Sequence, residues 1–210
     1  MWELVKAGGW LMLPLVLCSI FTVAITIERF IRLKKALILP NPILLKVGQS
    51  SETVVQQLKQ STTLKNSTLG RIFLAGYQSK NKSSEYVRAQ MEVTASQEIS
   101  YLEKNINFLG TLSAVAPLLG LLGTVLGIIE SFLVIDLGTN SNPTLMIPGI
   151  SKALITTAAG MIIAIPALFA YRYFQRLVQE YIAELEQQAT LFHAGLFVEK
   201  LTNEDLDKVS

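Results

Sequence analysis

The most constraining feature of this sequence is a run without charged residues at positions 105–129. As an α-helix rising about 1.5 Å per residue, this run exceeds the roughly 30 Å hydrocarbon core of a bilayer. Two further uncharged runs, 10–27 and 153–171, are each about one bilayer long. The sequence therefore predicts an all-α integral membrane protein with three transmembrane helices.

The composition supports a membrane class and excludes several others. Half of the 210 residues are hydrophobic, and the mean hydropathy is +0.43, which is too apolar for an ordinary soluble domain. The net charge of +2 comes from bases scattered among acids, so no nucleic-acid partner is expected. Cys18 and His193 are single residues of their kinds. We therefore expect neither a disulfide framework nor a metal site, and no cofactor.

The chain divides by composition into alternating apolar and polar parts. Bases flank the inner ends of the three runs, whereas residues 136–148 contain none, so the positive-inside rule places that loop and the N-terminus outside. Residues 36–104 lack a spanning stretch and show helical spacing of apolar residues. We expect an outer segment with the first transmembrane helix (1–35), a cytoplasmic helical region continuous with the membrane helices (36–104), a second transmembrane helix (105–135), a periplasmic loop (136–148), a third transmembrane helix (149–174), and a cytoplasmic C-terminal helix and tail (175–210).

The second and third runs each carry a stripe of small or hydroxyl-bearing residues at alternating spacings of four and three. The first stripe consists of Ser113, Pro117, Gly120, Thr124, Gly127 and Ser131, and the second of Ala153, Thr157, Gly160, Ala164, Ala167 and Tyr171. Such stripes let helices pack closely, and packing is the reading that the pattern alone favours. Hydroxyl-bearing stripes on two adjacent helices also fit a lined interior, with Thr157 rather than Thr156 on the stripe.

Glu130 and Lys152 are the charged residues well inside the second and third spans. Buried membrane charges are costly and are usually paired or functional. The antiparallel helices place both charges at similar depth, so we hypothesise an ion pair near the outer mouth. Whether it forms within a chain or between chains stays open, and independent snorkelling to the interface is the alternative.

Two segments resemble the ExbB/TolQ/MotA proton-channel family. Residues 116–128 read APLLGLLGTVLGI, and residues 148–160 read PGISKALITTAAG, with AIPA following at 164–167. The opening MWELVKAGGWLMLP and the length are most similar to the ExbB members. The resemblance covers all three spans.

This resemblance implies a multi-pass protein of the bacterial inner membrane with a periplasmic N-terminus and a cytoplasmic C-terminus. It implies a pentamer in which the second and third helices surround a pore. That pore would hold the single helix of an ExbD-like partner with a titrating aspartate, and a TonB-like protein would couple the complex to outer-membrane import. The family's two membrane threonines correspond to Thr124 and Thr157. From the stripes we also expect five further residues to line the pore: Ser113, Gly120, Gly127, Ala153 and Gly160. Membrane lipid is expected to surround the protein.

One position departs from the family pattern. ExbB-like chains commonly carry a glutamate where this chain has Lys152, so a proton-carrying role does not transfer to that position. Neither stripe carries an aspartate, glutamate or histidine. The chain is therefore expected to act as the stator housing for a partner's proton carrier.

Other functions remain as alternatives. A TolQ-like stator for envelope maintenance, or a paralogue, shares the same segments, and a non-conducting membrane scaffold fits the stripes as well. An enzyme is not expected, because no histidine or ligand cluster lies in the membrane segments. No Walker-type loop is present, so ATP is not the expected energy source.

Overall fold

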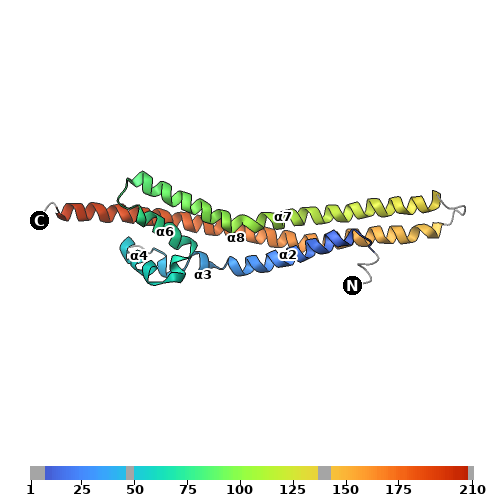
Figure 1. Cartoon of the computed structure of the whole chain (residues 1–210), viewed down its shortest axis with the longest axis horizontal. Coiled ribbons are helices and arrows are strands. Elements are labelled where there is room, and N and C mark those ends of the chain that lie inside the picture. The colour runs from blue at the N-terminus through green and yellow to red at the C-terminus, as the bar shows by residue number, and fades with distance from the viewer. Residues whose placement is uncertain (1–7, 46–49, 137–142, 208–210) are drawn as a thin grey trace. The chain divides into compact units, whose positions relative to one another are not determined.

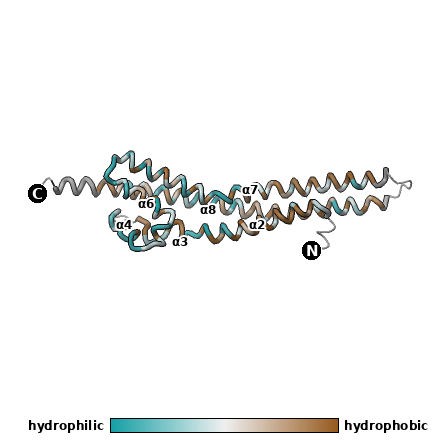
Figure 2. Tube along the Cα trace, viewed as in Figure 1, coloured by the Kyte–Doolittle hydropathy of each residue, from teal (hydrophilic) through white to brown (hydrophobic). Residues whose placement is uncertain are grey.

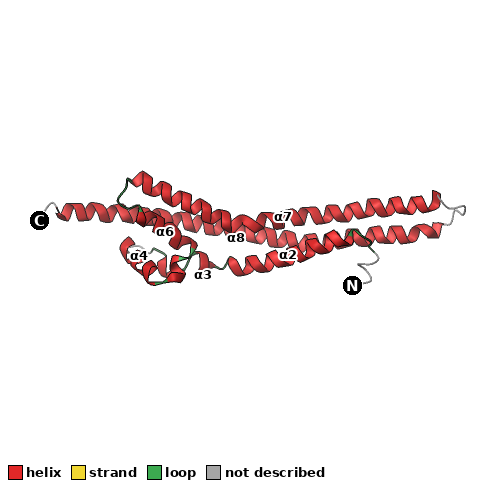
Figure 3. Ribbon diagram, viewed as in Figure 1, coloured by secondary structure: helices red, strands yellow, loops and turns green. Residues whose placement is uncertain are grey.

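The computed structural model describes residues 8–45, 50–136 and 143–207, and every regular element in those ranges is a helix (Figure 3). Seven α-helical segments and two short 3-10 helices (η) follow one another there. In chain order they are α2 (Met12–Arg32), α3 (Lys35–Ile38), η1 (Asn41–Ile43), α4 (Ser51–Gln60), α5 (Thr62–Lys65), α6 (Thr68–Gln78), α7 (Ser84–Asp136), η2 (Pro143–Met146) and α8 (Ile147–Asp207).

Three of these helices, α2, α7 and α8, are long and apolar enough to cross a membrane. This confirms the predicted all-α fold with three spanning helices. α7 and α8 contain 53 and 61 residues, more than twice the roughly 20 that one crossing needs. In Figure 2 the apolar colour occupies the second half of α7 and the first half of α8, and polar residues dominate their other halves. Both helices thus continue unbroken from apolar into polar sequence.

The chain forms two compact units, each assembled from segments distant in sequence. The first, here called the span unit, combines residues 1–29 with 105–174. The second, here called the polar unit, combines residues 30–104 with 175–210. The expected boundaries after residues 104 and 174 fall inside α7 and α8, close to where one unit passes into the other. Most of the expected outer loop, residues 137–142, lies outside the described residues.

The span unit packs α2 against the antiparallel pair formed by α7 and α8 (Figure 1). Met12 and Leu15 of α2 join Ala116 and Ala164 in a buried apolar cluster. The remaining face of α2 is covered with large apolar side chains that are about half exposed or more, such as Leu13 and Ile27. An apolar surface of this extent suits contact with lipid rather than with water.

The polar unit is held by a core between its short helices and α8. The rings of Phe73 and Phe192 stack with centroids 4.2 Å apart, and Leu58, Leu69 and Ile72 are fully buried. Serines begin two of the short helices: Ser50 Oγ accepts a hydrogen bond from the Glu52 amide, and Ser67 Oγ accepts one from the Gly70 amide.

Polar contacts join the segment that follows α2, residues 33–45, to α8. Tyr181 Oη donates to the Leu33 carbonyl at 3.0 Å, and the Leu45 amide donates to Gln188 Oε1 at 2.7 Å. Lys35 lies 2.8 Å from Glu184, and this hydrogen-bonded carboxylate raises the pKa of Lys35. These bonds fix the chain after α2 on the flank of α8, so the short helices form a layer against it.

Candidate pore-facing site

The two stripes bring α7 and α8 into close backbone contact. A Cβ atom added at Gly160 would lie 2.6 Å from the Ala116 carbonyl oxygen, and one at Gly120 would lie 3.0 Å from the Thr156 carbonyl oxygen. At Gly127 the added atom would meet the Gly149 carbonyl oxygen at 2.8 Å. No larger side chain fits at these three positions without moving a helix backbone, which is the physical reason for the small residues.

Four of the predicted pore-lining residues are therefore buried between the two helices of one chain. These residues are Gly120, Gly127, Ala153 and Gly160. Within one chain, these four residues therefore serve the close packing of the two helices, which is the role that the stripe pattern alone favoured. Their pore-lining role in an assembly stays a prediction.

The hydroxyl-bearing residues of the stripes are placed differently. Ser113, Thr124 and Thr157 are half-buried. Thr157 Oγ1 donates across the helix pair to the Gly120 carbonyl at 3.0 Å, whereas Thr124 Oγ1 donates within its own helix to the Leu121 carbonyl at 2.6 Å. Ser113 Oγ likewise donates to the Gly110 carbonyl at 2.7 Å. Each proton is committed to a backbone carbonyl, so each oxygen presents lone pairs, and hence an acceptor, to its surroundings.

Thr156 occupies a different place from Thr157. It is only 1% exposed, its Oγ1 donates to the Ala153 carbonyl at 2.9 Å, and its side chain fills the space left by Gly123. The sequence analysis did not identify this contact. Gly123 lies one helical turn from both Gly120 and Gly127, which is a signal that could have indicated it.

The two membrane charges lie together at the end of the span unit nearest the α7–α8 connection. Lys152 Nζ lies 2.7 Å from Glu130 Oε2 and 3.0 Å from Oε1, within one chain. Their side chains are 29% and 53% exposed. Contacts of this length match a charge-assisted hydrogen-bonded pair.

The turn before α2 packs on this ion pair, a contact that the sequence analysis missed. Gly9 has a φ of +73°, and a Cβ atom there would collide with Lys152 Cε and approach Nζ to 3.0 Å. The Gly9 carbonyl accepts a hydrogen bond from the Met12 amide at 3.1 Å, at the start of α2. Glycine at position 9 thus allows both the left-handed backbone and the close approach of the lysine stem.

Apart from this pair, residues 105–133 and 144–171 carry no charged side chain. Among the described residues no group of three histidine, cysteine, aspartate or glutamate side chains is arranged to hold a metal. The facing parts of α7 and α8 therefore offer hydroxyl acceptors and the Glu130–Lys152 ion pair. In residues 105–133 and 144–171, no aspartate, glutamate, histidine, lysine or arginine lies nearer mid-depth than this pair.

Three spanning helices, two of them joined along glycine- and threonine-bearing faces, define a helical multi-pass membrane protein. The sequence model of the MotA/TolQ/ExbB proton channel family matches residues 64–187. The chain belongs to this family, and it is accordingly a multi-pass protein of the inner membrane.

Known relatives include members with different roles. An ExbB-like biopolymer transport protein of Synechocystis is 33% identical over 91% of this chain and 78% of its own length. The Tol-Pal system protein TolQ of Haemophilus influenzae is 35% identical over 51% of this chain and 49% of its own length. The biopolymer transport protein ExbB of Salmonella typhimurium is 37% identical over 51% of this chain and 41% of its own length.

Proposed function

We propose that this chain is the ExbB-like stator subunit of a complex driven by the proton-motive force. In this proposal it forms a pentamer whose second and third helices surround the single helix of an ExbD-like partner. A TonB-like protein then transmits the work to outer-membrane import. The N-terminus faces the periplasm, and the polar unit faces the cytoplasm.

The observation that carries this proposal is the state of the hydroxyls on α7 and α8. The hydroxyls of Thr124 and Thr157 both donate their hydrogen bonds to backbone carbonyls, so in this arrangement each hydroxyl oxygen accepts a hydrogen bond from a guest. A protonated carboxyl is a donor, whereas a carboxylate is not. Two acceptors beside a guest acid favour its protonated, neutral form, which is the form that an acid needs at mid-membrane.

The ion pair has a structural role in this proposal. Glu130 and Lys152 neutralise each other at 2.7 Å, so neither is free to carry protons past the threonines. The pair holds α7 to α8 at the outer mouth, while the guest helix supplies the titrating group. Where ExbB-like chains commonly have a glutamate, this chain has Lys152, and the acidic partner, Glu130, lies on the facing helix.

Substitutions of Thr157 test the proposal in a host strain lacking its own copy of this gene. Thr157→Val removes the acceptor with little change in volume, and we expect it to abolish energy-dependent uptake of an iron chelate. Thr157→Ser keeps the hydroxyl and is expected to retain uptake. Thr156→Val is the matched control, because that hydroxyl is buried on its own helix. Co-purification of the partner must stay unchanged in all three, and wild-type uptake by Thr157→Val would overturn the proposal.

The TolQ-like role is the second candidate, since the relatives include TolQ proteins with identities similar to those of the ExbB proteins. Complementation separates the two. Rescue of a strain defective in TonB-dependent uptake supports the first role, and rescue of the detergent sensitivity of a strain defective in the Tol-Pal system supports the second. A non-conducting scaffold predicts that proton flux into vesicles containing both subunits equals that of empty vesicles.

A further inference from the structure

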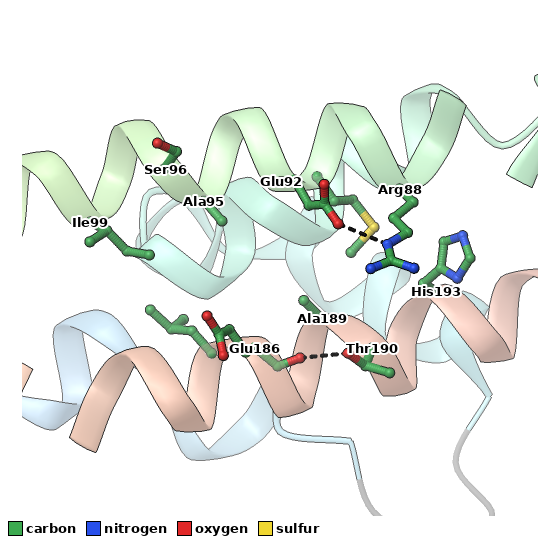
Figure 4. A pocket seen from close by; sticks show the side chains of 11 residues that line it. Arg88, Glu92, Ala95, Ser96, Ile99, Glu186, Ala189, Thr190 and His193 are labelled. Carbon is green, nitrogen blue, oxygen red and sulfur yellow. Dashed lines mark hydrogen bonds and ion pairs between the residues drawn. The ribbon is translucent and has the colours of Figure 1, made fainter. Parts of the chain in front are cut away.

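Two helices of the polar unit enclose a cavity of about 620 Å³, with α7 on one side and α8 on the other (Figure 4). This volume lies within the range of roughly 300–1,000 Å³ that is typical of small-molecule sites. The residues that line it from α7 run from Arg88 to Ile99, which is about 16 Å along the helix. Ala95 of α7 and Ala189 of α8 line the cavity from opposite helices, and their short side chains leave the space open.

The deep wall of the cavity is apolar. Met91 of α7 and Leu185 of α8 line it and are 4% and 1% exposed. Ala95, Ile99 and Ala189 continue this lining and are half-buried. Hydrocarbon placed against such a wall is removed from water, which is favourable. The wall therefore selects a ligand with an apolar body.

The charged residues of the cavity leave one negative charge uncompensated. Arg88 Nε donates to Glu92 Oε1 at 2.8 Å, so these two charges neutralise each other. Glu186 also lines the cavity, and none of the basic residues that the structure describes forms an ion pair with it. With His193 neutral, one positive and two negative side chains give the lining a net charge of −1. An anionic ligand would meet a guanidinium that is already paired, together with the repulsion of Glu186.

A hydroxyl one helical turn from Glu186 adds a further hydrogen-bond acceptor to the lining. Thr190 Oγ1 donates to the Glu186 carbonyl oxygen at 2.9 Å, so the lone pairs of this hydroxyl remain for a ligand. The Glu186 carboxylate is an acceptor only. These two groups therefore require a ligand that brings N–H or O–H donors, and the charge of the carboxylate favours donors that are themselves positively charged.

We propose that this cavity binds a linear aliphatic amine, with its ammonium group against the Glu186 carboxylate and its hydrocarbon chain along Met91 and Leu185. An alkyl ammonium group supplies three N–H donors and the positive charge that the lining lacks. The cavity is longer than the four-carbon stem of a lysine side chain, so a free amine with a longer chain fills it better than a lysine of another protein. The site uses none of the residues assigned to the stator function and goes beyond that function.

Calorimetric titration of the full chain, purified in detergent, tests this site with octylamine as the probe. We expect saturable binding of one amine per chain, whereas octanoate, with a chain of the same length and the opposite charge, is expected to give none. Glu186→Gln keeps the size of the side chain and removes its charge, and we expect it to weaken octylamine binding about tenfold or more. Glu180→Gln is the matched control, because Glu180 pairs with Arg176 outside the cavity, and it should bind octylamine as the unaltered chain does.

A second variant tests the apolar wall. Ala189→Leu places a larger side chain in the cavity, and we expect loss of octylamine binding with an unfolding midpoint no lower than that of the unaltered chain. Octanoate binding as tight as that of octylamine would show that only hydrocarbon is recognised and would overturn the proposal. Full binding by Glu186→Gln or by a folded Ala189→Leu, or absence of saturable octylamine binding, would also overturn it. Because binding is measured on the purified chain, these results are separate from those of the uptake assays.

Discussion

At the scale of single residues, Gly9 packs against Lys152 and so leaves room for its ion pair with Glu130. Gly9 has the positive φ that starts α2 and leaves the space that Lys152 occupies on its way to Glu130. Gly9→Ala introduces a methyl group into the lysine stem and strains the turn. We expect loss of the ion pair and a lower midpoint of thermal unfolding in detergent. Trp10→Ala, at an exposed neighbouring position, serves as the control and should leave that midpoint almost unchanged.

The ion pair itself can be tested by exchanging its charges. Glu130→Lys or Lys152→Glu alone puts two like charges about 3 Å apart at the membrane boundary, which is destabilising. The double variant restores opposite charges at the same places and is expected to recover the assembled protein. The measurement is the amount of folded oligomer extracted from membranes. A double variant no better than the singles would show that Glu130 and Lys152 act independently.

At the scale of elements, the contact between α7 and α8 depends on backbone approach rather than on side-chain volume. Gly160→Val would press its side chain against the Ala116 carbonyl and Gly120. Overpacking of this kind typically costs about 1–3 kcal/mol. We expect a lower unfolding midpoint in detergent and loss of the bond from Thr157 to Gly120. Ala158→Val, on the exposed side of the same helix, should be tolerated, and equal effects of the two would contradict this account.

Prolines lie inside both long helices without ending them. Pro117 of α7 and Pro166 of α8 each remove one backbone donor, so the carbonyls four residues earlier lose their helix partner. Proline is tolerated in membrane helices where neighbouring helices and hydroxyls satisfy the backbone. Pro117 is therefore part of the stripe, as the sequence analysis predicted, and does not end the helix.

At the scale of the whole molecule, the polar unit is a separate folded body with its own core. Phe192 stacks on Phe73 and is fully buried, so Phe192→Ala removes a ring from a packed core at a typical cost of about 3–5 kcal/mol. We expect residues 51–78 to become sensitive to limited proteolysis while the spans stay inserted. Phe192→Leu should show a smaller effect, and unchanged proteolysis of Phe192→Ala would show that the stack does not hold the unit.

The sequence by itself determined the three spans, because an uncharged run of bilayer length is typical of a membrane-spanning helix. It also indicated the family through the two glycine-rich segments. It also indicated Glu130 and Lys152 as charges at equal depth. Only the tertiary structure decided that Gly120, Gly127, Ala153 and Gly160 pack within one chain and that Thr156 is buried beside Gly123. It also decided that Gly9 rests on Lys152. Periodicity gives the face on which a residue lies, whereas the identity of the neighbour on that face depends on how distant segments meet.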